Sequence, residues 1–200
     1  MEKETYVFIG RSGSGKGTQI KLLKNFIQEK FPKQNILHFE SGARFRAFIE
    51  GDGYTNMLMR DILAKGDLAP DFITDWLFVD ELVKYFHEDD LLLMDGFPRT
   101  MHQALVLDSA MRYYGRKNIK IIHIEVSEEE ARKRMRMRLR ADDLDEEVIE
   151  KRIRWYNENV LPTLEFFRAQ EDRYQVLDIN GEESIEEVFH SIQEKLKLND

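Results

Sequence analysis

A glycine-rich segment near the N-terminus limits the fold of this chain more than any other feature. Residues 10–19 read GRSGSGKGTQ, and they lie between the apolar run 6–9 and a helical stretch at 16–30. Glycines let backbone N–H groups converge on an anion because no Cβ blocks the approach, and the helix adds the positive end of its dipole. The segment therefore predicts a phosphate-binding loop in an α/β fold. A flexible Gly/Ser loop is the alternative, and the flanking strand and helix argue against it.

The loop also predicts how a nucleotide is held. Lys16 supplies a point charge for the β- and γ-phosphates. Gly17 stands where such loops usually carry the Ser or Thr that ligates Mg²⁺, and Thr18 comes one place later, so direct metal ligation by the loop stays open. The ATP-binding residues expected here are Gly13, Ser14, Gly15, Lys16, Gly17 and Thr18.

Composition excludes several classes of function. The 200 residues carry a net charge of −8, which argues against nucleic-acid binding. The absence of cysteine excludes disulfides, thiol catalysis and a cysteine-bound zinc, and suits a reducing cytoplasm. No apolar run approaches the roughly 18 residues of a membrane span, and the N-terminus enters a strand without a signal peptide. We expect a cytoplasmic chain with no membrane partner.

The alternation of apolar runs and helical stretches predicts a parallel sheet with helices on both faces. The expected strands are 6–9, 36–39, 91–94, 119–126 and 174–179, and the expected helices are 16–30, 72–86, 101–114, 128–138, 146–170 and 184–196. This is a three-layer α/β/α fold with a five-stranded parallel sheet. We expect one domain, with a core at 1–40 and 70–200 and a helical insertion at about 41–69.

A second motif, LLLMDGFPRT at residues 91–100, ends another predicted strand. Asp95 would stand at the carboxyl end of that strand, where a carboxylate can face the water shell of Mg²⁺. The planar guanidinium of Arg99 suits a phosphate group. Taken alone, the aspartate could cap a turn and the arginine could be solvated.

The motifs GSGKGTQ at 13–19 and DGFPRT at 95–100 together strongly resemble the adenylate kinase family of nucleoside monophosphate kinases. The resemblance covers nearly the whole chain. It implies a P-loop fold and reversible, Mg²⁺-dependent phosphoryl transfer from ATP to AMP, giving two ADP. Because the acceptor phosphate is already ionised, such a reaction needs no general base.

The resemblance also implies an acceptor site. Ser41 stands where the family usually has Thr, Arg46 matches the residue that grips the acceptor phosphate, and Gln103 matches the side chain that reads adenine. Without the motifs, Ser41 would be taken for a helix N-cap and Gln103 for a solvated residue. The expected AMP-binding residues are Ser41, Gly42, Arg46, Asp67, Leu68, Ala69, Gly96, Arg99, Gln103, Arg140 and Arg152.

A basic run at 132–140 stands out in an otherwise acidic chain. By resemblance, Arg134, Arg138, Arg140 and Arg152 surround the transferring phosphate and complete the catalytic set with Lys16 and Arg99. Arg134, Arg138 and Glu183 also match ATP contacts. Arg132 and Arg136 have no such match and are expected to be solvated. We expect the helix to break between Arg138 and Ala141. The alternative interpretation of the whole basic run is an RNA-binding patch.

Two features depart from the family pattern. Most members carry a lid between the arginines that match Arg138 and Arg140, whereas this chain has only Leu139 there, which leaves a vestigial lid at about 138–143. Ala43 stands where the family commonly has Asp, so one carboxylate near the water shell of the metal is absent. Asp95 is therefore expected to contribute more to holding the metal, through water.

Three functions stay open on the sequence. Adenylate kinase is favoured, acting on ATP and AMP as a monomer with Mg²⁺ and no zinc. A UMP/CMP kinase would suit the short lid and Ser41, but Thr100 and Gln103 argue for AMP. A nucleotide-binding protein without transfer activity would suit Ala43, but it would need no acceptor arginines.

Overall fold

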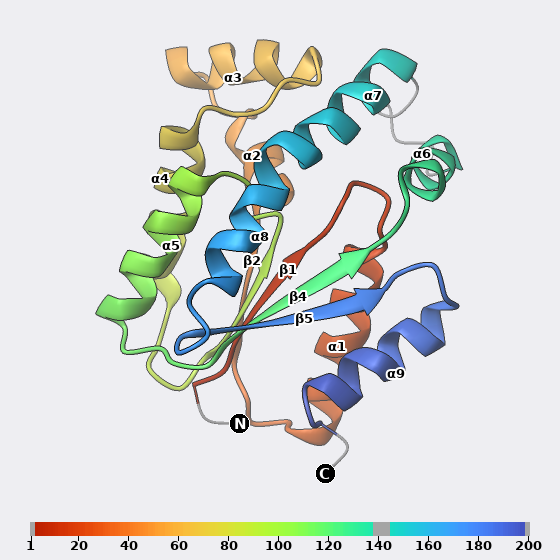
Figure 1. Ribbon diagram of the computed structural model, residues 1–200. Coiled ribbons are helices and arrows are strands. Elements are labelled where there is room, and N and C mark those ends of the chain that lie inside the picture. Colours follow the sequence, from red (N-terminus) through yellow and green to blue (C-terminus); the bar gives the residue numbers. More distant parts are fainter. Residues whose placement is uncertain (1–2, 138–144, 199–200) are drawn as a thin grey trace.

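The computed structural model describes residues 3–137 and 145–198. Five parallel strands form one sheet in the order β2-β3-β1-β4-β5 (Figure 1). The strands are β1 (Thr5–Ile9), β2 (Ile36–Glu40), β3 (Leu91–Asp95), β4 (Ile119–Glu125) and β5 (Tyr174–Asn180). The predicted three-layer α/β fold is confirmed, and each predicted strand is found to within one residue at either end.

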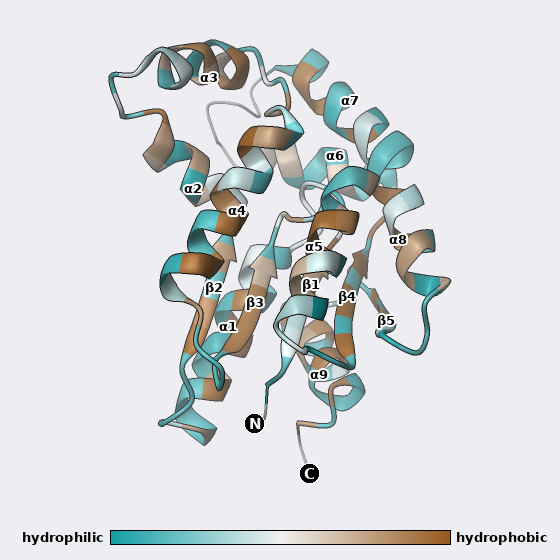
Figure 2. Cartoon of the chain, turned by 90° about the vertical axis from the view of Figure 1, so that its left-hand side faces the viewer, coloured by the Kyte–Doolittle hydropathy of each residue, from teal (hydrophilic) through white to brown (hydrophobic). Residues whose placement is uncertain are grey.

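Alternate residues of the central strands enter two separate cores, which is the period expected of a strand buried on both faces. Val7 and Leu92 belong to one core, while Phe8 and Leu93 belong to the other. Helices α1 (Lys16–Lys30) and α9 (Ile185–Lys195) cover one face. Helices α4 (Asp71–Tyr85), α5 (Met101–Tyr113) and α8 (Leu161–Arg168) cover the other (Figure 1). Helices thus cover both faces of the sheet. The hydrophobic residues of strand β3 are visible in Figure 2.

The segment between β2 and α4 is helical and contributes no strand, as the sequence predicted. It contains α2 (Ser41–Phe48) and α3 (Tyr54–Ala64). Gly66 follows α3 with φ +67°, and a Cβ there would approach the side chain of Val148 to 3.0 Å. The insertion therefore touches helix α7 (Glu146–Trp155) as well as the core.

The prediction of one helix over 146–170 is wrong in detail. Helix α7 passes into a π-helical turn, η2 (Tyr156–Val160), before α8 begins, and Leu161 N–H donates to the carbonyl of Tyr156. In a continuous α-helix, Pro162 would have no N–H to bond the carbonyl four residues earlier, and its ring would collide with that carbonyl. Pro162 stands instead in the first turn of α8, where proline is tolerated.

Helix α6 (Glu128–Met137) lies beside α7. Within the described ranges, none of the helices is long and apolar enough to cross a membrane.

The two-core arrangement predicts that truncating a buried apolar residue destabilises the protein much more than truncating an exposed one. Leu93 in β3 is fully buried, whereas Val83 on the outer side of α4 is 73% exposed. Leu93→Ala should lower the free energy of unfolding by about 2–5 kcal/mol because it leaves a cavity, whereas Val83→Ala should change it by under about 0.5 kcal/mol. Urea denaturation followed by circular dichroism measures both, and equal effects would contradict the assignment of the core.

Candidate active site

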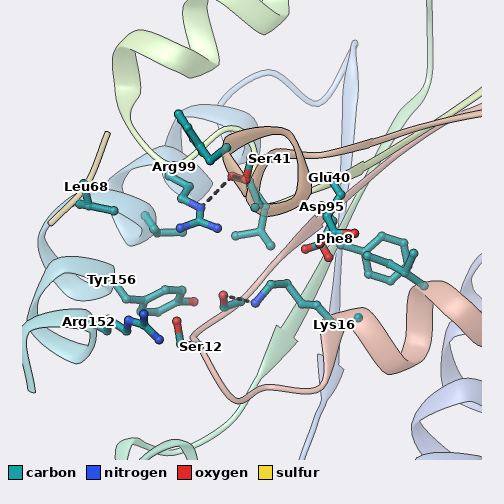
Figure 3. A pocket seen from close by; sticks show the side chains of 18 of the residues that line it. Phe8, Ser12, Lys16, Glu40, Ser41, Leu68, Asp95, Arg99, Arg152 and Tyr156 are labelled. Atoms are coloured by element: carbon teal, nitrogen blue, oxygen red, sulfur yellow. Dashed lines mark hydrogen bonds between the residues drawn. The ribbon is translucent and has the colours of Figure 1, made fainter. Parts of the chain in front are cut away.

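One cleft of about 1960 Å³ opens at the carboxyl edge of the sheet (Figure 3). It is bounded by the segments that follow β1, β2 and β3, with residues of α6 and α7 opposite, at the edge where α/β sheets bind ligands. The expected site residues that line it are Gly13, Gly15, Lys16, Gly17, Thr18, Ser41, Gly42, Arg46, Asp67, Leu68, Ala69, Asp95, Gly96, Arg99, Gln103, Arg134 and Arg152.

A few expected residues are not brought to this cleft. Ser14 is buried and does not line it. Glu183 is exposed and accepts a hydrogen bond from Asn180 at 3.2 Å instead. Arg138 and Arg140, together with the expected helix break and the reduced lid, lie outside the described residues.

Two glycines of the loop at 10–19 adopt a backbone conformation that other residues rarely adopt. Gly13 and Gly15 have φ +85° and +92°, in the left-handed region that favours glycine. Gly15 is the N-cap residue of α1, whose first turn contains no acidic side chain. The positive end of the helix dipole is therefore not neutralised from within the helix and can attract an anion.

Lys16 already lies across the mouth of this loop. Its Nζ donates to the carbonyl oxygens of Gly10 at 2.7 Å and Arg11 at 2.9 Å (Figure 3). These bonds orient the ammonium group close to the loop. A phosphate bound in the loop would therefore meet a positive charge that is already in place.

Two carboxylates stand side by side at the strand ends. Glu40 and Asp95 are register partners across β2 and β3, and both line the cleft (Figure 3). The sequence reasoning missed Glu40, although it follows an apolar strand just as Asp95 does. Its carboxylate accepts a hydrogen bond from Arg46 Nη2 at 2.9 Å. The site thus has a second carboxylate even though Ala43 supplies none.

Arg99 and Ser41 meet on one carbonyl group. The Ser41 hydroxyl donates to the Gly96 oxygen at 2.9 Å, and Arg99 Nε donates to the same oxygen at 2.7 Å (Figure 3). Ser41 is therefore not an N-cap, and Glu40 holds that position instead. Burial lowers the pKa of Arg99, Asp95 opposes the shift and Arg152 adds to it. Arginine nevertheless keeps its charge in proteins, so the cleft contains a poorly hydrated cation that an anion would stabilise.

Gln103 is buried rather than solvated, and its amide has a fixed orientation. Its Oε1 accepts from the backbone N–H of Arg99 at 2.8 Å, and its Nε2 donates to Asp71 Oδ1 at 2.8 Å. Because the two partners require opposite ends of the amide, they decide which end is oxygen. One N–H and one lone pair of the amide then remain for a further partner in the cleft. Asp71 begins α4, and the sequence reasoning did not identify it.

The basic run of α6 divides into two groups. Arg134 lines the cleft and bonds Glu130 at 2.7 Å and the Gly181 carbonyl at 2.9 Å. Arg136 is exposed, as expected, whereas Arg132 is only partly exposed, and both side chains form ion pairs that the sequence did not predict. Arg132 makes two bonds to Glu150, and Arg136 makes two to Glu146. These pairs join α6 to α7, because glutamates recur on α7 at helical spacing opposite the arginines.

Comparison with known proteins bears directly on this cleft. A model of the adenylate kinase family matches residues 8–172. Adenylate kinase of Flavobacterium johnsoniae is 34% identical to the chain, covering 95% of it and 98% of the relative. The chain belongs to the adenylate kinase family. Adenylate kinases of Leptospira biflexa and Thermosipho africanus are 32% and 30% identical, each covering 93% of the chain and 96% of the relative.

Membership of the adenylate kinase family makes the chain a phosphotransferase, and the alternative of a UMP/CMP kinase is not favoured. Among the residues that the structure describes, His, Cys, Asp and Glu side chains form no group of three or more that could hold a metal ion.

The loop geometry predicts a specific effect of adding a methyl group. A Cβ at Gly13 would lie 2.8 Å from the carbonyl oxygen of Ala131, whereas a Cβ at Gly115 would meet no atom within 4 Å. Both residues have positive φ, so alanine at either should cost about 1–2 kcal/mol of backbone strain. Only Gly13→Ala should also displace the loop and weaken Mg-ATP binding, by about tenfold or more.

Isothermal titration calorimetry with Mg-ATP, combined with thermal unfolding, separates the two contributions. Gly115→Ala is the matched control. Unchanged ATP affinity in Gly13→Ala would show that the loop does not hold the triphosphate.

Proposed function

We propose that the cleft transfers the γ-phosphoryl group of Mg-ATP to AMP, reversibly, giving two ADP. The observation that carries this proposal is the convergence of two cationic groups on one cleft. Lys16 and the phosphate loop form the donor side, while Arg46 and Arg99 form the acceptor side. A protein that only bound ATP would have no need of the second group.

On this proposal the side chains act by positioning and by charge. Lys16 and the loop N–H groups hold the donor phosphates, and Arg46 and Arg99 hold the AMP phosphate in line with them. Arg134 and Arg152, with Arg138 and Arg140 beyond the described residues, balance charge as it moves. An ionised acceptor phosphate carries no proton to be removed, so no general base is assigned.

The donor set fits Mg²⁺. Mg²⁺ is commonly held by one or two carboxylates together with nucleotide phosphates, and it keeps several waters. Asp95 and Glu40 are the two carboxylates that would face those waters. When bound, the ion neutralises phosphate charge and orients the donor.

The helical insertion at about 41–69 is proposed to bind AMP and to close over the cleft. Asp67 already forms an ion pair with Lys151 of α7, which links the insertion to the far wall of the cleft. We further propose that the chain acts in the cytoplasm as a monomer without a nucleic-acid or membrane partner, which suits its net charge of −8.

The assignment of the two phosphate sites is tested by removing one cation from each. Lys16→Ala and Arg99→Ala should each lower ADP formation from Mg-ATP and AMP by about 10³-fold or more, with the fold retained. Arg112→Ala serves as the control, because Arg112 is an exposed residue of α5 bonded to Asp108. Near-normal activity in either site variant would overturn the assignment.

Base selection is tested with a panel of AMP, UMP, CMP, GMP and no acceptor. Wild-type protein should depend strongly on AMP. Gln103→Leu should lower kcat/KM for AMP by about 10–100-fold, because a buried base edge loses its partner, and should lower it less for UMP. A preference for UMP or CMP in the wild-type chain would contradict the role of Gln103. ADP formed equally without an acceptor would show that the site leaks to water.

A further inference from the structure

Arg11 lies inside the phosphate loop, yet its side chain does not line the cleft. Its Nη1 donates to the Val126 carbonyl at 3.0 Å, and its Nη2 donates to Asn157 Oδ1 at 2.9 Å. The guanidinium carbon also lies 4.5 Å from the centre of the Tyr156 ring, a distance at which a cation is attracted to an aromatic face. One side chain thus contacts the end of β4 and the π turn that follows α7.

The partners of Arg11 on the π turn are themselves held in place. Asn157 Nδ2 donates to Glu128 at the start of α6 at 2.8 Å. The hydroxyl of Tyr156 lies 2.8 Å from His123 Nε2 in strand β4. Burial raises the pKa of Tyr156 to about 12, so the hydroxyl stays neutral. Arg11 therefore contacts groups whose own positions are fixed by neighbouring elements.

The position of Arg11 in the chain connects these contacts to the site. Its backbone carbonyl accepts a hydrogen bond from Lys16, so its conformation bears on the donor side. Tyr156 lies one helical turn after Arg152, and both residues line the same cleft as Ser12 of the loop (Figure 3). The guanidinium of Arg11 thus lies between the loop that carries Lys16 and the helix that carries Arg152.

We propose that Arg11 is a positioning residue for phosphoryl transfer, which fixes the phosphate loop against the helix that carries Arg152. The inference rests on the proposed function, in which Lys16 and Arg152 act on the same transferring group. A planar guanidinium can meet a carbonyl, an amide oxygen and a ring at once, whereas a lysine ammonium cannot reproduce that geometry. A displacement of about 1 Å between such groups can cost about a hundredfold in rate.

The test compares kcat with nucleotide affinity. Arg11→Met should lower kcat for ADP formation by about 10–100-fold, because the loop and α7 lose their common partner. The Kd values of Mg-ATP and AMP, measured by calorimetry, should stay within about threefold, since Arg11 makes no contact in the cleft. Arg11→Lys keeps the charge but should recover only part of kcat. Arg112→Met is the matched control.

A double-mutant cycle tests whether the contact with Asn157 carries the effect. Asn157→Ala should lower kcat on its own, and its effect should largely disappear in the Arg11→Met background. This variant also serves if Arg11→Met does not fold, because it leaves the loop residue in place.

Three outcomes would overturn the proposal. They are wild-type kcat in Arg11→Met, full recovery by Arg11→Lys, and additive effects in the cycle. A loss of kcat matched by an equal loss of nucleotide binding would assign Arg11 to binding and would also overturn it. A wild-type protein that transfers no phosphate would count against the proposed function instead.

Discussion

The burial of the sheet on both faces is the constraint from which the rest of this structure follows. Consecutive residues of β1 and β3 enter opposite cores, so no polar side chain can be accommodated along the middle of these strands without a partner. In β3 the one charged side chain, Asp95, accordingly stands at the carboxyl end of the strand. Parallel strands place all their carboxyl ends at one edge, and this edge gathers the phosphate loop, Glu40 and Asp95 into a single cleft.

The same cleft concentrates positive charge in a chain whose net charge is −8. Each of four cations there is held by an oxygen atom of the protein: Lys16 by loop carbonyls, Arg46 by Glu40, Arg99 by Gly96 and Arg134 by Glu130. These bonds limit the rotamers of long side chains before any ligand arrives. Side chains that are already oriented lose less entropy when they bind phosphate, and electrostatic stabilisation of a transition state depends on such orientation.

The sequence predicted the parts of the site that depend on local pattern. Lys16 could be identified because glycines and a strand precede it, and Asp95 because four apolar residues do. Glu40 needed the additional knowledge that β2 lies next to β3, which no local pattern reveals. Asp71 was missed for a similar reason, since it reaches Gln103 from a helix 32 residues earlier.

Two misses have different physical causes. The π turn precedes Pro162, which stands in the first turn of α8. The sequence prediction ran a single helix through this proline. Arg11 lies in the phosphate motif itself, but the motif predicts only groups that face the cleft, and the side chain of Arg11 does not line the cleft. Its partners come from β4 and from the π turn more than 100 residues later, so only the packed structure could identify it.

The contacts of α7 bear on the proposed closure of the cleft. Two arginine–glutamate pairs, each with two hydrogen bonds, join α7 to α6. Arg11 joins the π turn that follows α7 to the loop. The described contacts between the insertion and α7 include the approach of Gly66 to Val148 and the exposed ion pair of Asp67 with Lys151. Exposed ion pairs contribute little to stability and exchange readily with water. The described contacts therefore tie α7 to α6 by more bonds than they tie it to the insertion, which supports the proposal that the insertion is the part that closes over the cleft.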